Sequence, residues 1–109
     1  MAGLMNHGDV RWYRFAQPDK KRPILILTRD SAVEYLQELT VAPITSTIRS
    51  IPSEVFLSTT DGMPRECAVN LDHLQTVAKA RIGPLITHLG ESKLTEVRSA
   101  LLFALGFRR

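Results

Sequence analysis

Four consecutive aliphatic residues, 24–27, constrain the fold of this chain more than any other feature. An unbroken aliphatic run of this length suits a β-strand that is covered on both faces. A basic run, residues 20–22, leads into it through Pro23. After a polar connection, residues 38–45 alternate as a second strand would, with Pro43 near its end. We therefore expect two successive strands here, followed by a hydroxyl-rich loop.

Short strand candidates continue along the rest of the chain. Each combines aliphatic, aromatic or β-branched residues and is bounded by turn residues. The clearest turn is Thr59-Thr60-Asp61-Gly62, which joins two strand candidates, and a second turn is predicted at residues 81–84. The predicted strands span residues 10–15, 24–27, 38–45, 54–57, 67–70, 74–77 and 85–89, with short helical turns at 31–37 and 71–73.

The last segment changes its hydrophobic period. Leu94, Val97, Leu101 and Leu105 recur at helical spacing. Gly106 is placed to end this helix in a left-handed conformation, and the helix is expected to start within residues 90–92. Short strands followed by one helix predict a mainly β fold, a small bent barrel packed by a C-terminal helix. We expect a flexible leader at residues 1–6 and a single domain at 7–109.

The composition bounds the class of protein. With 109 residues, 44% hydrophobic and 23% charged, the chain is predicted to fold as one domain. Its net charge of +3 is a mild bias toward anionic partners. Cys67 is the single cysteine, and its apolar neighbours predict a buried structural thiol. We see neither a membrane-spanning apolar run nor a signal-peptide pattern, so we expect a cytoplasmic protein with no membrane partner.

The spacing of residues disfavours several kinds of site. His7, His73 and His88 are far apart and have no paired Cys or His neighbours, so we expect neither a metal site nor another cofactor. The six glycines are scattered, and no phosphate-cradling glycine loop is formed. No nucleophile-elbow pattern supports a Ser-His-Asp triad. What remains is a group of cations and hydroxyls.

That group lies between residues 20 and 49. Arg22 precedes Pro23, which favours an extended backbone at Arg22. Its guanidinium carries five donors in a planar fork that suits a phosphate. Residues 45–47 add three hydroxyls, and Arg49 adds a second fork. Two interpretations remain open on the residues alone: a small anion site, or solvated side chains at the ends of two strands.

Five segments, taken together and in order, carry a resemblance to a known family. They read RPILILTRD, VAPITSTIRSIPSEVFL, CAVNLDHLQTV, KARIG and LTEVRSALLFALGF. Each is weak alone, whereas five in the right order are specific. From about Gly8 to Phe107 the chain resembles the toxins of type II toxin–antitoxin systems known as MazF or PemK/Kid.

The resemblance implies a fold and an activity. The fold is the SH3-like β-barrel of the plasmid-maintenance-toxin (CcdB/PemK) type, assembled as a homodimer. The activity is that of a metal-independent endoribonuclease that cuts single-stranded RNA at short sequences. A cognate antitoxin with an acidic, disordered tail is implied to neutralise it. By motif, Arg22 matches the arginine that begins a family strand and Thr45 matches the threonine of an A-x-I-T segment, and both are implied to be catalytic.

The implied chemistry is physically coherent. Metal-free cleavage uses the 2′-hydroxyl as nucleophile, which restricts the substrate to RNA and yields a 2′,3′-cyclic phosphate and a 5′-hydroxyl. The crowded phosphorane requires charge stabilisation, which Arg22 and Thr45 are suited to supply. A guanidinium stays protonated in proteins, so Arg22 is a poor general base, and the base remains unassigned.

Further residues are expected to bind RNA around this pair. The loop before Arg22 is shorter than in many relatives, which leaves its two lysines to contact phosphates. Asp72-His73 stands where the family commonly has an acidic residue followed by Gln. A histidine that stacks on a base or exchanges a proton, and a purely structural histidine, both remain open. The predicted RNA-binding residues are Lys20, Lys21, Ser46, Thr47, Arg49 and His73.

Two other classes of function remain as alternatives. The same barrel supports CcdB-type toxins, which bind DNA gyrase through the C-terminal helix and have no catalytic chemistry. Two motifs of this chain, R-P at Arg22 and A-P-I-T ending at Thr45, instead follow the nuclease branch of the fold. A degenerate paralogue that only binds RNA or an antitoxin is the third possibility.

Overall fold

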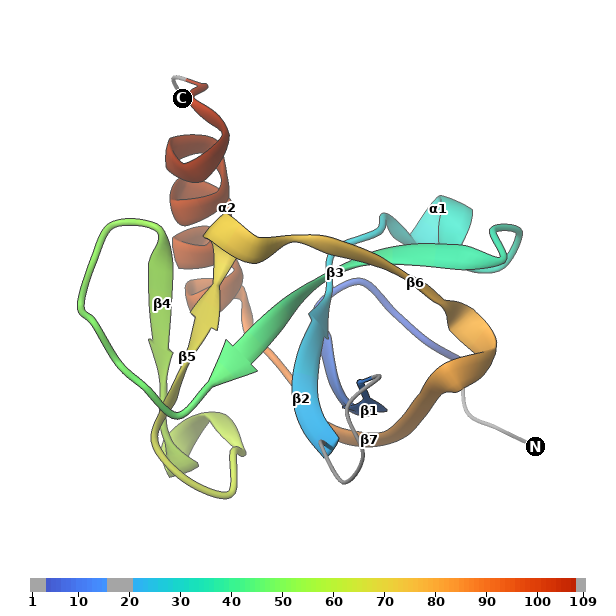
Figure 1. Cartoon of the computed structure of the whole chain (residues 1–109), viewed down its shortest axis with the longest axis horizontal. Coiled ribbons are helices and arrows are strands. Elements are labelled where there is room, and N and C mark those ends of the chain that lie inside the picture. The colour runs from blue at the N-terminus through green and yellow to red at the C-terminus, as the bar shows by residue number, and fades with distance from the viewer. Residues whose placement is uncertain (1–3, 16–20, 108–109) are drawn as a thin grey trace.

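The computed structural model describes residues 4–15 and 21–107, which form a bent antiparallel sheet with a helix packed beside it (Figure 1). The strands follow the order β4-β5-β3-β2-β1-β7, and β6 also pairs with β3. The strands are β1 (Asp9–Arg14), β2 (Lys21–Ile26), β3 (Glu38–Thr45), β4 (Glu54–Leu57), β5 (Cys67–Asn70), β6 (Gln75–Ala78) and β7 (Ile82–His88). The helices are α1 (Asp30–Val33) and α2 (Glu91–Leu105), with 3-10 turns η1 (Thr59–Asp61), η2 (Leu71–His73) and η3 (Lys79–Arg81).

The aliphatic run in β2 is covered on both faces, as predicted. Ile24 and Ile26 pack in one apolar cluster with side chains of β1, β3, β6 and β7. Leu25, between them, packs in a second cluster on the other face, and all three are fully buried. This alternation follows from the two-residue period of a strand. The sheet thus separates two small cores.

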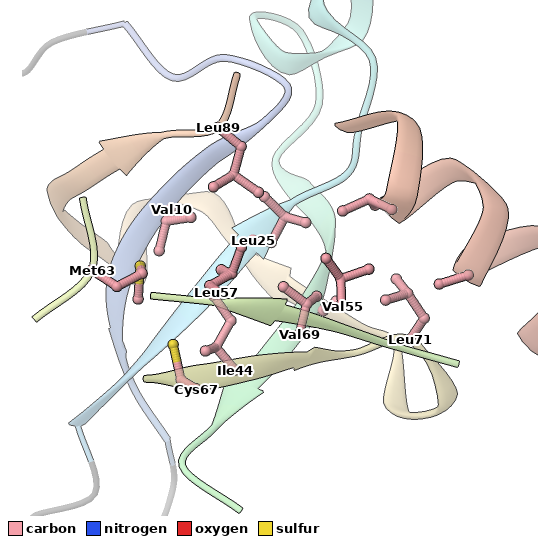
Figure 2. Packing of buried hydrophobic residues seen from close by; sticks show 13 residues of the cluster. Val10, Leu25, Ile44, Val55, Leu57, Met63, Cys67, Val69, Leu71 and Leu89 are labelled. Atoms are coloured by element: carbon pink, nitrogen blue, oxygen red, sulfur yellow. The ribbon is translucent and has the colours of Figure 1, made fainter. Parts of the chain in front are cut away.

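The second cluster is the larger one and joins the sheet to α2 (Figure 2). It draws Val10 and Leu25 from one half of the sheet and Val55, Leu57 and Val69 from the other. Side chains from strands that are far apart in the sheet order meet here because the sheet bends. Val97 and Ala100 complete the cluster from the buried stripe of α2. The predicted mainly β fold with a C-terminal helix is confirmed.

Both predicted limits of that helix are confirmed. Gly90 is its N-cap, directly before Glu91, within the predicted start at residues 90–92. Gly106 caps the C-terminus with φ +82°, a left-handed conformation that favours glycine. The helix contains no window that is long and apolar enough to cross a membrane, and the same holds for the other helix that the structure describes.

One predicted turn is wrong. Residues 81–84 were expected to turn the chain, whereas β7 begins at Ile82, which pairs with Tyr13 of β1. Pro84 is accommodated because β7 is the last strand of the sheet order, so one of its sides needs no N–H donor. The turn that does precede β7 is η3. The strand limits otherwise differ from the prediction by a few residues at most.

The N-terminal residues that the structure describes contact the domain. Met5 packs against the smaller cluster, and the backbone N–H of Asn6 donates to Asp9 Oδ2 at 2.9 Å. Asn6 and Met5 belong to the predicted leader, whose residues 1–3 lie outside the described part of the chain. Met5 and Asn6 thus contact the domain, and the predicted boundary between leader and domain at residue 7 stays a prediction.

Candidate functional site: a basic cleft between two strands

Two prolines end the hydrogen-bonded ladder between β2 and β3. The last residue pair of that ladder is Ile24 with Pro43. Pro43 has no N–H to donate, and neither has Pro23, the next residue on β2. Beyond this point β3 pairs through Ile44 and Thr45 with β5, on its other edge. The start of β2 and the end of β3 are therefore not bonded to each other.

A cleft of about 420 Å³ opens where the ladder ends. One group of lining residues comes from the start of β2, and another comes from the end of β3. The connection before β5 supplies the third group, and β1 contributes a tryptophan. The lining residues are Trp12, Lys21, Arg22, Pro23, Ile44, Thr45, Ser46, Met63, Pro64, Arg65 and Cys67.

The cleft is basic at its rim and apolar at its base. Lys21, Arg22 and Arg65 are exposed, whereas Ile44, Met63 and Cys67 belong to the buried core. No Asp or Glu stands among the described residues that line it. Three cations, with no carboxylate among the described lining residues, give this cleft a positive field, which attracts anions. The geometry therefore supports the anion-site interpretation of residues 20–49 over the solvated-loop interpretation.

The Thr45 hydroxyl keeps its own proton available for donation. Its Oγ1 accepts the backbone N–H of Thr47 at 3.1 Å. A hydroxyl that accepts one hydrogen bond still has its own O–H to donate. Ser46, the next residue, is exposed and adds a second hydroxyl to the same cleft. Arg22 and Thr45, the two predicted catalytic residues, are thus brought to one site.

Lys21 lies against an aromatic ring in this cleft. Its Nζ is 5.2 Å from the centre of the Trp12 ring, a cation–π distance. The pair spans the β1–β2 ladder, in which Trp12 lies opposite Pro23. Trp12 was predicted only as a strand residue. An aromatic residue flanked by basic residues is typical of single-stranded nucleic-acid sites, and this signal was present in the sequence.

The segment before β5 was missed as part of the site. Pro64 and Arg65 reach the cleft although they are far in sequence from Arg22 and Thr45. No motif marks them, because the contact depends on how β5 packs beside β3. Cys67 is free and buried, which confirms the predicted burial of this thiol. Burial raises the pKa of this thiol, the nearby Asp61 carboxylate adds to the rise, and the Arg65 guanidinium opposes it.

Three predicted RNA-binding residues do not line the cleft. The Arg49 guanidinium lies 3.5 Å from Glu54 Oε2, and Thr47 is exposed in the loop after β3. His73 lies in η2, where its Nδ1 is 2.8 Å from Asn70 Nδ2. That turn follows β5, which pairs with β3 on the edge opposite β2, and His73 is not among the residues that line the cleft. Lys20 lies outside the described residues.

Within residues 4–15 and 21–107, no three His, Cys, Asp or Glu side chains gather closely enough to hold a metal ion. The buried side chains of Asp9 and Arg11 and the half-exposed His88 form a separate polar group. The Arg11 guanidinium donates to the Gly83 carbonyl at 3.0 Å, and its Nε lies 3.6 Å from Asp9 Oδ2. This group joins β1 to β7 and does not line the cleft.

The described part of the chain combines a small bent β-sheet, a C-terminal helix and a basic cleft with no carboxylate among its described lining residues. The sequence model of the PemK-like, MazF-like toxins of type II toxin–antitoxin systems matches residues 6–105. The chain therefore belongs to this family, and the predicted plasmid-maintenance-toxin fold is confirmed.

Individual relatives agree with the family assignment. The chain is 36% identical over 110 residues to the probable endoribonuclease MazF5 of Mycobacterium tuberculosis, and the match covers 100% of both chains. It is 37% identical over 92 residues to endoribonuclease MazF3 of the same species, covering 84% of this chain and 89% of the relative. The solved structure of Mycobacterium tuberculosis toxin MazF-mt6 superimposes with a TM-score of 0.85 at 31% identity, covering 93% and 99% of the two chains.

Proposed function

We propose that this chain is an endoribonuclease toxin that cleaves single-stranded RNA without a metal ion. The observation that carries the proposal is the meeting of Arg22 and Thr45 in a cleft that has three cations and no carboxylate among its described lining residues. Such a cleft suits a polyanion, and its chemical groups suit phosphoryl transfer. The family membership and the endoribonuclease names of the relatives support the same reaction.

In the proposed reaction, the 2′-oxygen of one nucleotide attacks the adjacent phosphorus. The bond from phosphorus to the 5′-oxygen of the next nucleotide breaks, and the products are a 2′,3′-cyclic phosphate and a 5′-hydroxyl. The 2′-hydroxyl loses its proton to a base that remains unassigned, and the 5′-oxygen gains one. Arg22 and the Thr45 hydroxyl donate hydrogen bonds to the phosphorane oxygens, whose charge is largest in the transition state.

Base stacking adds a reason for single-stranded substrates. Trp12 borders the cleft beside Lys21, and a base that stacks there must be unpaired. Lys21 and Ser46 bind the phosphates that flank the scissile one. Lys20, Thr47, Arg49 and His73 remain predicted RNA-binding residues. A longer RNA that extends beyond the cleft would be needed to reach the last three.

The toxin acts in the cytoplasm as a homodimer in this proposal, and an antitoxin restrains it. An acidic, disordered tail of the antitoxin competes with RNA for the basic cleft, because both present negative charge to Lys21, Arg22 and Arg65. The family match favours this function over a CcdB-type toxin that binds gyrase.

The test is cleavage of single-stranded RNA in EDTA by the wild type, Arg22→Ala and Thr45→Ala, with analysis of the fragment ends. We expect cyclic phosphates from the wild type, and a rate about 10²–10³-fold lower for each variant. No cleavage by the wild type, or equal cleavage by all three proteins, would refute the proposed mechanism. A gyrase supercoiling assay runs alongside, and inhibition without RNA cleavage would favour the CcdB-type alternative.

A further inference from the structure

The connection between η1 and β5, residues 62–66, is held in place by contacts at both of its ends and is called the arm below. Ser58 and Asp61 form a reciprocal capping box around η1, in which each side chain accepts a backbone N–H of the other end. Gly62 then takes φ +92°, which directs the chain toward the cleft. The Thr87 hydroxyl of β7 donates to the Asp61 carbonyl at 3.0 Å and ties the arm to the sheet. The arm therefore has a fixed position before it reaches residue 65.

The far side of the arm is also anchored. Met63 is 4% exposed and Cys67 is equally buried, and both pack in the larger core cluster (Figure 2). Pro64 and Arg65 lie between these two anchors and are exposed. Both line the cleft. An arginine between two buried residues has its backbone held in place while its side chain is exposed.

The Arg65 side chain makes no polar contact within the described part of the fold. It forms no hydrogen bond and no salt bridge with any residue that the structure describes, whereas Arg11 and Arg49 both do. No carboxylate among the described lining residues neutralises it. β3 lies between β2 and β5 in the sheet, so Arg22 and the arm approach Thr45 from opposite edges of β3. Arg22, Thr45 and Arg65 thus line one cleft.

We propose that Arg65 binds an RNA phosphate next to the scissile one, across Thr45 from Arg22. This inference rests on the proposed function, because it assumes that the cleft holds RNA. One guanidinium at the scissile phosphate and a second on the other side fix the direction of the strand through the cleft. Arg65 contributes binding energy equally before and during the reaction, so it lowers KM and leaves kcat almost unchanged.

The experiment compares the wild type with Arg65→Ala, Arg65→Lys and the control Arg98→Ala. Arg98 is an exposed arginine of α2 that does not line the cleft, so its removal changes the net charge equally. Two probes are used: a short single-stranded RNA, and its analogue with a 2′-O-methyl group at every position, which the proposed mechanism cannot cut. Dissociation constants for the analogue are measured by fluorescence anisotropy over a series of salt concentrations.

For Arg65→Ala we expect the Kd for the analogue and the KM to rise about tenfold, since a charged hydrogen bond to phosphate is lost. The slope of log Kd against log salt falls by about 0.7, the value for one phosphate contact on a single strand. The kcat stays within about twofold, and Arg65→Lys restores most of the affinity because it keeps the charge. Thermal melting of the variants should match the wild type, because Arg65 is exposed.

The inference is overturned if Arg65→Ala binds the analogue as tightly as Arg98→Ala does, with the same salt slope. A fall in kcat with an unchanged KM would also overturn it and would place Arg65 in the chemistry. Failure of the proposed function looks different: the wild type would bind the analogue with an Arg65-dependent slope but would not cut the RNA in EDTA. That outcome would keep Arg65 as a phosphate-binding residue and reject the nuclease mechanism.

Discussion

His88 Nδ1, in the last residue of β7, lies 2.8 Å from Oδ1 of Asp9, the first residue of β1. The two strands are neighbours at the edge of the sheet, and their register shifts twice along the ladder. Asp9 is 3% exposed, and its other oxygen accepts the N–H of Asn6 and lies 3.6 Å from Arg11. A buried carboxylate thus holds the two strands where the backbone ladder is irregular.

The first prediction concerns this carboxylate. Asp9→Ala should lower the free energy of unfolding by about 3 kcal/mol, because Arg11 is left as a buried cation without its carboxylate. His88→Ala should lower it by only about 1 kcal/mol, because the imidazole is half-exposed and water replaces it. Urea unfolding of the two variants measures both changes. Equal losses would show that the Arg11 charge is not stabilised by Asp9.

The arm before β5 depends on Gly62. A Cβ at this position would lie 2.3 Å from Thr87 Oγ1, and φ is +92°. We expect Gly62→Ala to cost about 2–4 kcal/mol, from the clash together with the left-handed backbone. Gly106→Ala has only the strain of the left-handed backbone, since φ is +82° and no atom lies within 4 Å of the added Cβ. It should cost about 1 kcal/mol.

Gly90→Ala is the matched control for both glycine variants. Gly90 has φ −73° and no atom within 4 Å of the added Cβ, so this variant should stay within about 0.5 kcal/mol of the wild type. Melting temperatures of the three variants should therefore fall in the order Gly90→Ala, Gly106→Ala, Gly62→Ala. Any other order would contradict the assignment of strain and clash.

The loop after the cleft depends on Glu54 more than on Arg49. The buried Glu54 carboxylate accepts the backbone N–H of Arg49 at 3.0 Å, and this loop contains Ser50 at φ +56°. Glu54→Ala should cost about 1–2 kcal/mol, because it removes a charged acceptor. Arg49→Ala keeps the N–H and loses only an exposed ion pair, so it should cost less than about 0.5 kcal/mol. Thermal unfolding of the two variants decides, and a larger loss for Arg49→Ala would contradict this explanation.

Cys67 should make stability depend on alkaline pH. Burial raises the pKa of its thiol in the folded state above its value in the unfolded chain. The neutral thiol therefore stabilises the folded state, and this contribution is fully present at a pH below the pKa of the thiol in the unfolded chain. That contribution is lost as the pH rises above about 8.5, where the unfolded thiol ionises first, with a limiting slope of about 1.4 kcal/mol per pH unit.

Cys67→Ala provides the comparison for this effect, because other groups that titrate in the same range are common to both proteins. The difference in unfolding free energy between the wild type and Cys67→Ala should shrink between pH 8 and pH 10, as measured by urea unfolding. A difference that stays constant across this range would show that the thiol does not couple to folding.

The Arg22 side chain should not be replaceable by lysine. We expect Arg22→Lys to lose about 10–100-fold in kcat, because the ammonium keeps the charge but not the planar fork of donors that a phosphorane accepts. Arg65→Lys, by contrast, is expected to keep most of its binding. Single-turnover cleavage rates for Arg22→Lys test this, and a wild-type rate would mean that Arg22 acts only through its charge.

Local patterns in the sequence were sufficient for most of the fold. The strands at 38–45, 54–57 and 67–70 and the helix ending at Gly106 follow from side-chain period and turn residues, which are local properties. The aliphatic run in β2 predicted two covered faces, because a strand alternates its side chains between them. The motifs around Arg22 and Thr45 also identified the family.

The tertiary structure decided what local patterns cannot express. The turn predicted at residues 81–84 is part of β7, because Pro84 is tolerated on an edge strand and the sequence does not show which strand is at the edge. Arg65 reaches the cleft only because β5 pairs with β3 at Thr45, a contact between distant segments. His73, placed near the RNA by motif alone, is not among the residues that line the cleft. Period and composition determine each element, whereas strand order determines which side chains share a cleft.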